Sequence, residues 1–338
     1  MNHPFRASGP MHWLLEKFSS VSPWSLIGAI SPEERSLAVL ADLHKTGRLA
    51  NGEFIRVEPA HHYQPNQFRD SFTKKLKARE RESKRIAGKA VNVRSREILC
   101  READLIAVAR ESLGSCSRNL IIDISAMPKR LFFPLITLAM ESFNHQNIIV
   151  TYASPKRYGD TLAEDPLPWN ALPMFGATSP EGNIGLKLLI AVGYQALSLK
   201  QIVDGVRFNA GNVELLLPFP SVHPGFTKNW EFVRQIRDEL PELRGASIKR
   251  VPTRDVSLAY DRIVAMTNSG RTPAVLAPYG PKPLSLAMCL YGIACRAANI
   301  PVEIGYTQPQ VYSDRYSTGI TAVSAYCIRI AGQSLYRL

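Results

Sequence analysis

Two lysines stand at matched places in the chain, each directly after a proline that follows a short apolar run. Pro128-Lys129 follows LIIDIS, and Pro281-Lys282 follows AVLAPY. Proline favours the first position of a helix, where its missing amide proton costs no hydrogen bond. The free amides and the dipole of a helix start attract anions, and a lysine there adds a full positive charge. The pattern therefore predicts that Lys129 and Lys282 bind phosphate.

Tyrosine and aspartate recur where the last strand of each half is expected to end. Tyr158 and Asp160 share a YxxPxxYxD pattern with Tyr312 and Asp314. A tyrosine there can stack on a base, and an aspartate can accept a hydrogen bond from a ribose hydroxyl. Packing of the tyrosine on a neighbouring helix and capping of a turn by the aspartate are the alternative roles.

A further group could support catalysis in the first half alone. Asp123 and Ser125 end the first apolar run, and the second half has no equivalent acid. His62 and His223 recur at matched places on predicted loops. They could contact phosphate or a base, or act as general bases if a partner is within reach. An enzymatic site would combine His62, Asp123, Ser125 and Lys129. The alternative for Asp123 is to cap a helix or brace a loop.

A cluster of positive charge follows the second predicted strand. The chain has a net charge of +12, and residues 67–89 hold nine Lys or Arg against three Asp or Glu. The segment 66–96 is predicted to be a long exposed helix with only a thin apolar stripe. Seven cations could line a nucleic-acid backbone, or form a solvated face or a docking surface for an acidic partner protein: Lys74, Lys75, Lys77, Arg79, Arg81, Lys84 and Arg85.

The chain of 338 residues resembles itself over a domain-sized interval. The stretch that ends at Asp160 is similar to one that ends at Asp314, and the two Pro-Lys pairs are in register. Self-similarity at a fixed spacing indicates repeated structural units. We therefore predict an internal duplication that makes the chain a pseudo-dimer.

Strands and helices are predicted to alternate in each half. The runs LIIDIS, NIIVTY, VELLLPF and AVLAPY are typical of strands buried on both faces of a parallel sheet. The predicted fold is α/β, with two tandem Rossmann-like, doubly wound modules. The expected divisions are an N-terminal extension 1–23, a first module 24–165, a Pro/Gly-rich surface linker 166–184 and a second module 185–338. The run ITAVSAYCIRIAG is expected to close the second module as a strand that caps a sheet edge.

Composition narrows the possible partners and cofactors. Hydrophobic residues make up 45% and charged residues 21% of the chain, as in folded globular proteins. No apolar run is long enough for a membrane span and no signal core is visible, so we expect a cytoplasmic protein without a membrane partner. Five cysteines without pairing or nearby histidines favour neither a metal site nor disulfides. No GxGxxG or GxxxxGK[ST] motif is present, so no cofactor is predicted.

The doubled pattern resembles the CARF sensor domains of CRISPR systems, and a fused pair is similar to the SAVED domains of antiphage signalling. The matching positions are Ser125 to Lys129 and Tyr279 to Lys282. The resemblance implies two modules about a pseudo-twofold axis that hold a cyclic or linear oligonucleotide in a shared cleft. It also implies a place in a multi-protein bacterial defence system, with a partner subunit.

Three functions stay open on the sequence. The first is a pseudo-symmetric binding or sensor module for a nucleotide or short oligonucleotide. The second is an enzyme on nucleotides or nucleic acid, a phosphodiesterase or a glycosidic-bond hydrolase, that uses the first half only. The third is a structural subunit that binds DNA or RNA through the basic helix.

Overall fold

The computed structural model describes residues 5–18, 23–60, 66–159, 162–176, 185–196, 199–201, 208–221 and 225–338. The chain divides into two compact units. Unit 1 comprises Met1–Asp165 and Pro309–Leu335, and unit 2 comprises Pro166–Gln308 and Tyr336–Leu338. Each unit is built around its own sheet of mainly parallel strands.

The sheet of unit 1 contains five parallel strands in the order β4-β3-β2-β5-β6. Their bounds are β2 Trp24–Ile30, β3 Leu49–Glu58, β4 Val91–Glu97, β5 Asn119–Asp123 and β6 Asn147–Tyr158. Every residue of β2 and β5 is buried, as expected for strands covered on both faces. Numbered along the chain, the parallel strands follow the order 3-2-1-4-5 of a Rossmann half.

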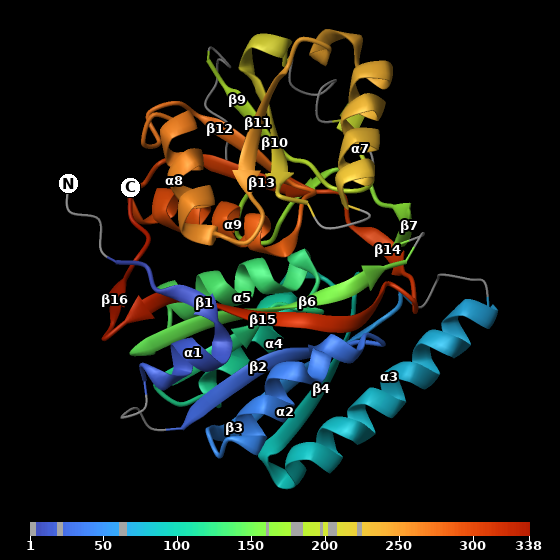
Figure 1. Cartoon of the computed structure of the whole chain (residues 1–338), viewed down its shortest axis with the longest axis vertical. Helices are drawn as coiled ribbons and strands as arrows, with labels where there is room; N and C mark the ends of the chain where they lie inside the picture. The colour runs from blue at the N-terminus through green and yellow to red at the C-terminus, as the bar shows by residue number, and fades with distance from the viewer. Residues whose placement is uncertain are drawn as a thin grey trace. The chain divides into compact units, whose positions relative to one another are not determined.

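Helices cover both faces of this sheet (Figure 1). Contacts join α2 (Ala38–Lys45) to α3 (Asn66–Ala87), and α4 (Glu102–Gly114) to α5 (Lys129–Glu141). Right-handed crossovers place the first pair on one face and the second pair on the other, because the strand order reverses between β2 and β5. The described residues of the unit also form the short helices α1 (Met11–Glu16), η1 (Glu34–Leu37) and η2 (Gly88–Ala90).

Unit 2 repeats this order of parallel strands, as β11-β10-β9-β12-β13. The bounds are β9 Lys187–Ala191, β10 Val213–Phe219, β11 Ser247–Pro252, β12 Ala274–Pro278 and β13 Val302–Tyr306. Helix α7 (Gly225–Glu239) follows β10, and α8 (Val256–Met266) packs on α9 (Lys282–Ala297). The short helices η3 (Ala210–Asn212) and η4 (Pro241–Leu243) precede β10 and β11. The predicted α/β fold with Rossmann-like sheets is confirmed, whereas the internal duplication stays a prediction.

The C-terminal strand belongs to unit 1 and not to the second module, where the sequence had placed it. Strand β15 (Ser317–Ile330) runs antiparallel to β6 and covers an edge that the parallel strands leave open. On its other side it pairs with β1 (Ser8–Pro10), and β16 (Gln333–Ser334) folds back on its end. Strands β7 (Ala163–Pro166) and β14 (Pro309–Tyr312) form a separate two-stranded sheet.

Part of the predicted surface linker is packed into unit 2. Strand β8 (Asn170–Ala171) pairs with β13, and Phe175 is buried. A Cβ at Gly305 would collide with the Trp169 ring, and one at Gly292 would collide with Phe175. These two glycines therefore make room for the linker, although its Pro/Gly content had indicated a surface path.

The basic segment 66–96 is helical over only part of its predicted length. Helix α3 ends at Ala87, and Gly88 follows with φ +55°, a left-handed conformation that glycine adopts without strain. The remainder forms η2 and strand β4, which pairs with β3 at the edge of the sheet.

Candidate functional site

Lys129 and Lys282 occupy the same topological place in their units. Each is the first residue of the helix that follows the fourth parallel strand, α5 after β5 and α9 after β12. Pro128 and Pro281 are the N-cap residues with extended ψ angles of 149° and 153°, one position earlier than the sequence had indicated. Because the strand order reverses next to this strand, both helix starts lie where doubly wound sheets bind ligands.

Burial changes the protonation of Lys129. Loss of solvent around the ammonium group lowers the pKa of Lys129 to about 7. A lysine in water stays charged to well above neutral pH. The side chain of Lys129 therefore changes charge near neutral pH, and a phosphate beside it would favour the charged form.

Asp123 and Ser125 form a closed set of hydrogen bonds at the end of β5. Asp123 Oδ1 accepts hydrogen bonds from the backbone N–H of Ser125 at 3.1 Å, from Ser125 Oγ, and from Thr151 Oγ1 at 3.3 Å. Ser125 Oγ in turn accepts from the N–H of Ala153 at 2.7 Å. Both side chains are buried. This arrangement braces the turn that leads into α5, the structural role that the sequence had left open for Asp123.

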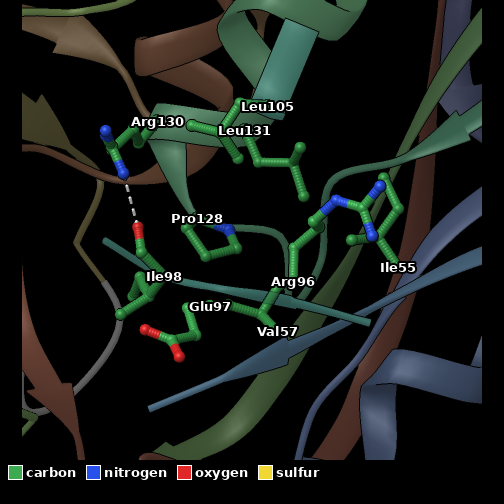
Figure 2. Close-up of a pocket in the computed structure, with 9 residues that line it drawn as sticks. All are labelled: Ile55, Val57, Arg96, Glu97, Ile98, Leu105, Pro128, Arg130 and Leu131. Carbon is green, nitrogen blue, oxygen red and sulfur yellow. Dashed lines mark hydrogen bonds between the residues drawn. The ribbon is translucent and has the colours of Figure 1, made fainter. Parts of the chain in front are cut away.

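A shallow pocket opens beside the first turn of α5 (Figure 2). Its empty volume of about 240 Å³ includes space open to solvent, so it is not an enclosed ligand cavity. Arg130 Nη1 donates a hydrogen bond of 2.7 Å to the Ile98 carbonyl at its rim. The lining residues come from β3, β4 and the residue after it, α4, and the N-cap and first turn of α5: Ile55, Val57, Arg96, Glu97, Ile98, Leu105, Pro128, Arg130 and Leu131. The walls are mainly aliphatic, which does not favour phosphate.

Tyr158 and Tyr312, predicted to be twins in two modules, both belong to unit 1. Tyr158 OH lies 3.0 Å from Tyr152 OH, and its ring meets Tyr316 edge-on at 6.1 Å between centroids. The Tyr312 ring lies 6.0 Å from the same Tyr316. Burial raises the pKa of Tyr158. The chain leaves unit 2 after Gln308, so Tyr312 is not the counterpart of Tyr158 in unit 2.

A buried ion pair beside these tyrosines was missed on the sequence. Arg35 Nε donates to Glu33 Oε2 at 2.8 Å, and the guanidinium lies 5.7 Å from the centre of the Tyr152 ring. Ser317, on the C-terminal strand, donates to the same carboxylate. The pair lies after β2, at the point where the strand order reverses. The run SPEER in front of an apolar helix was the available signal, but the partner Ser317 is distant in sequence.

Asp314 is held by the basic helix. Lys75 Nζ and Ser71 Oγ each lie 2.7 Å from Asp314 Oδ2. Burial raises the pKa of Asp314, but the hydrogen bonds from Lys75 and Ser71 outweigh it, and the pKa is lowered overall. Asp314 therefore fixes α3 in unit 1.

His62, Asp160 and His223 lie outside the described residues, so their roles stay predictions.

The turn before Lys282 is tightly packed. Tyr279 OH lies 2.9 Å from Thr307 Oγ1, and the Tyr279 ring stacks on Trp169 at 6.4 Å between centroids. A Cβ at Gly193, in the loop after β9, would collide with the Tyr279 carbonyl oxygen. This close approach joins the ends of β9 and β12 and fixes the start of α9.

The seven cations of α3 divide into two groups. Lys75, Arg79 and Lys84 pair with Asp314, Glu82 and Glu80. The other four are exposed and recur at three- and four-residue spacings, on the face opposite the buried Phe72 and Leu76. We call them the α3 stripe: Lys74, Lys77, Arg81 and Arg85.

The described residues hold no group of His, Cys, Asp or Glu that could bind a metal ion. Over the same part of the chain, each helix is too short or too polar to cross a bilayer.

No protein-family model and no curated protein matches the chain. Among solved structures, it is similar to a universal stress protein from Archaeoglobus fulgidus DSM 4304. The TM-score is 0.27 and the identity 9%, over 85% of this chain and 97% of that chain. A likeness of this size carries no conclusion about a ligand or an activity.

Proposed function

We propose that the chain binds a phosphorylated ligand, a nucleotide or short oligonucleotide, at the carboxyl ends of its parallel strands. Lys129 would contact phosphate in unit 1 and Lys282 in unit 2. The observation that carries the proposal is the identical place of the two lysines, each at the start of the helix after the fourth strand of a 3-2-1-4-5 sheet. By its resemblance to CARF and SAVED domains, the protein would act in the cytoplasm as the sensor of an antiphage system.

The physical basis is the electrostatics of a helix start. An α-helix begins with backbone N–H groups that point out along its axis, and the helix dipole favours negative charge beside them. Phosphate can accept hydrogen bonds from these groups and from the ammonium of the first residue. Such a site needs no glycine-rich loop, which agrees with the lack of one in the sequence.

Binding is favoured over the enzymatic alternative by the hydrogen bonds at the end of β5. Asp123 and Ser125, two of the expected catalytic groups, are buried and bonded to each other and to the neighbouring strand. A general base must reach a reacting group of the substrate. Groups committed to a turn are better suited to holding Lys129 in place.

Titration calorimetry tests the proposal with three probes: inorganic phosphate, ATP and short oligoadenylates. We expect Lys129→Ala and Lys282→Ala each to weaken binding of the best probe by roughly 10- to 100-fold, the value of a hydrogen bond to a charged group. The matched control is Lys45→Ala, an exposed lysine at the C-terminal end of α2, where the dipole repels anions. Its affinity should equal that of the wild type.

Two results would count against this function. One is unchanged affinity in both lysine variants with thermal stability preserved. The other is an equal loss in the Lys45→Ala control, which would indicate a general charge effect and no defined site.

The α3 stripe supports a second function, binding of a nucleic-acid backbone. Its four cations are turned away from the core and lie along about 16 Å of one helix face, at 1.5 Å per residue. Such a row can neutralise successive phosphates without reading the sequence of bases.

A further inference from the structure

Exposed aromatic side chains gather in one short stretch of unit 2. Phe219, Phe226 and Trp230 are 47%, 55% and 38% exposed. Each aromatic ring that stays in water forgoes a large gain in free energy from burial. Three such rings between residues 219 and 230 therefore indicate a surface made for contact.

Two of these rings continue into a row of arginines on helix α7. Phe226, Trp230, Arg234 and Arg237 follow one another at four- and three-residue steps, so they share one flank of the helix. The buried residues Phe232, Val233 and Ile236 face the core instead. The first three members of the row are exposed and Arg237 is half-buried. We call this row the α7 flank.

The two sides of α7 differ in charge. On the other side Lys228 pairs with Glu231 at 3.0 Å, so that its charge is compensated. The α7 flank carries two arginines, and Nε of Arg237 is buried without a hydrogen-bond partner among the described residues. Aromatic rings next to guanidinium groups are the combination that binds bases and phosphates together.

The spacing of the rings favours a single strand over a duplex. The centroids of Phe226 and Trp230 are 6.4 Å apart, with planes inclined at 72°. Bases stacked in a duplex are about 3.4 Å apart and parallel, so neighbouring stacked bases cannot each lie on one of these rings. Bases that are splayed out from a single strand can each stack on one of the two rings.

A second aromatic and cationic pair lies at the end of the strand that leads into α7. The Arg250 guanidinium lies over the Phe219 ring, 5.1 Å from its centre. Asn229 Nδ2 donates to Ser221 Oγ at 2.8 Å, a bond between α7 and a residue close to the end of β10. The aromatic positions are therefore held on a strand end and a helix, not on a free loop.

We propose that the α7 flank binds single-stranded nucleic acid, with bases stacked on Phe226 and Trp230 and phosphates bound by Arg234 and Arg237. The two arginines of the flank favour an anionic occupant over a second copy of the chain, whose net charge is +12. The proposal does not depend on Lys129 or Lys282.

Fluorescence anisotropy of a labelled 20-nucleotide oligothymidylate tests the proposal. Stacking of one base on an aromatic ring contributes about 1–3 kcal/mol, so Trp230→Ala should weaken binding roughly 5- to 150-fold, and Phe226→Ala should weaken it similarly. The matched control is Trp13→Ala, because Trp13 on α1 is 45% exposed and also has a lysine over its ring. A duplex of the same length should bind without sensitivity to Trp230.

Equal affinities of the Trp230→Ala and Trp13→Ala proteins, or no binding of the oligothymidylate by the wild type, would overturn the proposal. An acidic partner protein would then be the better occupant. The Trp230→Ala loss should persist in a Lys129→Ala/Lys282→Ala background, so failure of the phosphate site and failure of the α7 flank are distinguishable. Unchanged thermal unfolding of each variant excludes loss of the fold as the cause.

Discussion

The fold lowers the pKa of Lys129 into the range near neutral pH. Burial lowers its pKa to about 7 from the ordinary 10.5. Because the pKa of Lys129 is lower in the folded than in the unfolded state, the folded state binds fewer protons at pH values between these two pKa values. The cost to stability is therefore present in full below pH 7 and disappears as the pH rises toward 10. An anion that restores the charge recovers part of this cost.

Anion binding at Lys129 should accordingly take up a proton. With a dinucleotide, whose phosphodiester does not titrate near neutral pH, affinity should be highest below pH 7. It should fall by up to about tenfold per pH unit above it. Calorimetry in two buffers of different ionisation enthalpy measures the proton uptake directly.

The matched variant for this experiment is Lys129→Arg, whose guanidinium stays charged throughout the range. We expect its affinity to be flat between pH 6.5 and 8.5. Zero proton uptake by the wild type at pH 8, together with measurable binding, would contradict the assignment of Lys129 to the anion.

Features set by the local sequence could be predicted more readily than contacts between residues that are distant in the sequence. The Pro-Lys helix starts could be predicted because proline and the end of an apolar run act locally. The buried pair Glu33–Arg35 could not, since its setting depends on Tyr152 and Ser317, which the fold brings from distant strands. The repeat of Tyr158 in Tyr312 was misleading, because both residues lie in unit 1.

At the scale of elements, α3 combines two kinds of lysine and arginine. Arg79 pairs with Glu82, Lys84 pairs with Glu80, which Arg56 shares, and Lys75 anchors the helix to Asp314. The α3 stripe faces outward. The sequence could supply the helix and its charge, but only the positions of the carboxylates separate paired from outward-facing cations.

The α3 stripe predicts a particular salt dependence. Each phosphate neutralised in duplex DNA contributes about 0.9 to the slope of log affinity against log salt concentration. Lys77→Ala/Arg81→Ala should lower this slope by roughly 2, as measured by anisotropy of a labelled duplex at several salt concentrations. Arg79→Ala/Lys84→Ala removes the same net charge from the same helix and should change the slope much less. Equal changes in the two proteins would contradict a role for the stripe.

The strands themselves were predictable because apolar runs without alternation require cover on both faces. β5 begins one residue before the run identified on the sequence, and β6, β10 and β12 begin at the first residue of theirs. Where an element depends on a distant partner, prediction failed. Trp169 and Phe175 pack because Gly305 and Gly292 leave space for them, which no local pattern in the linker reveals.

At the scale of the molecule, two sheets with one strand order each present a lysine at the same helix start. The final strand does not follow this scheme. An apolar run such as ITAVSAYCIRIAG can pair with any open edge, and β15 selects β6 of unit 1 through a long antiparallel register. The predicted assignment of this strand to the second module therefore rested on chain order alone.

The central claim is that the two lysines hold a phosphorylated compound. The most direct measurement is mass spectrometry of the small molecules released when the purified protein is denatured, in the wild type and in Lys129→Ala/Lys282→Ala. We predict a phosphorus-containing compound from the wild type and its loss from the double variant, with cooperative thermal unfolding retained in both proteins. Equal release by both proteins, or no phosphorylated compound from the wild type, would contradict the account.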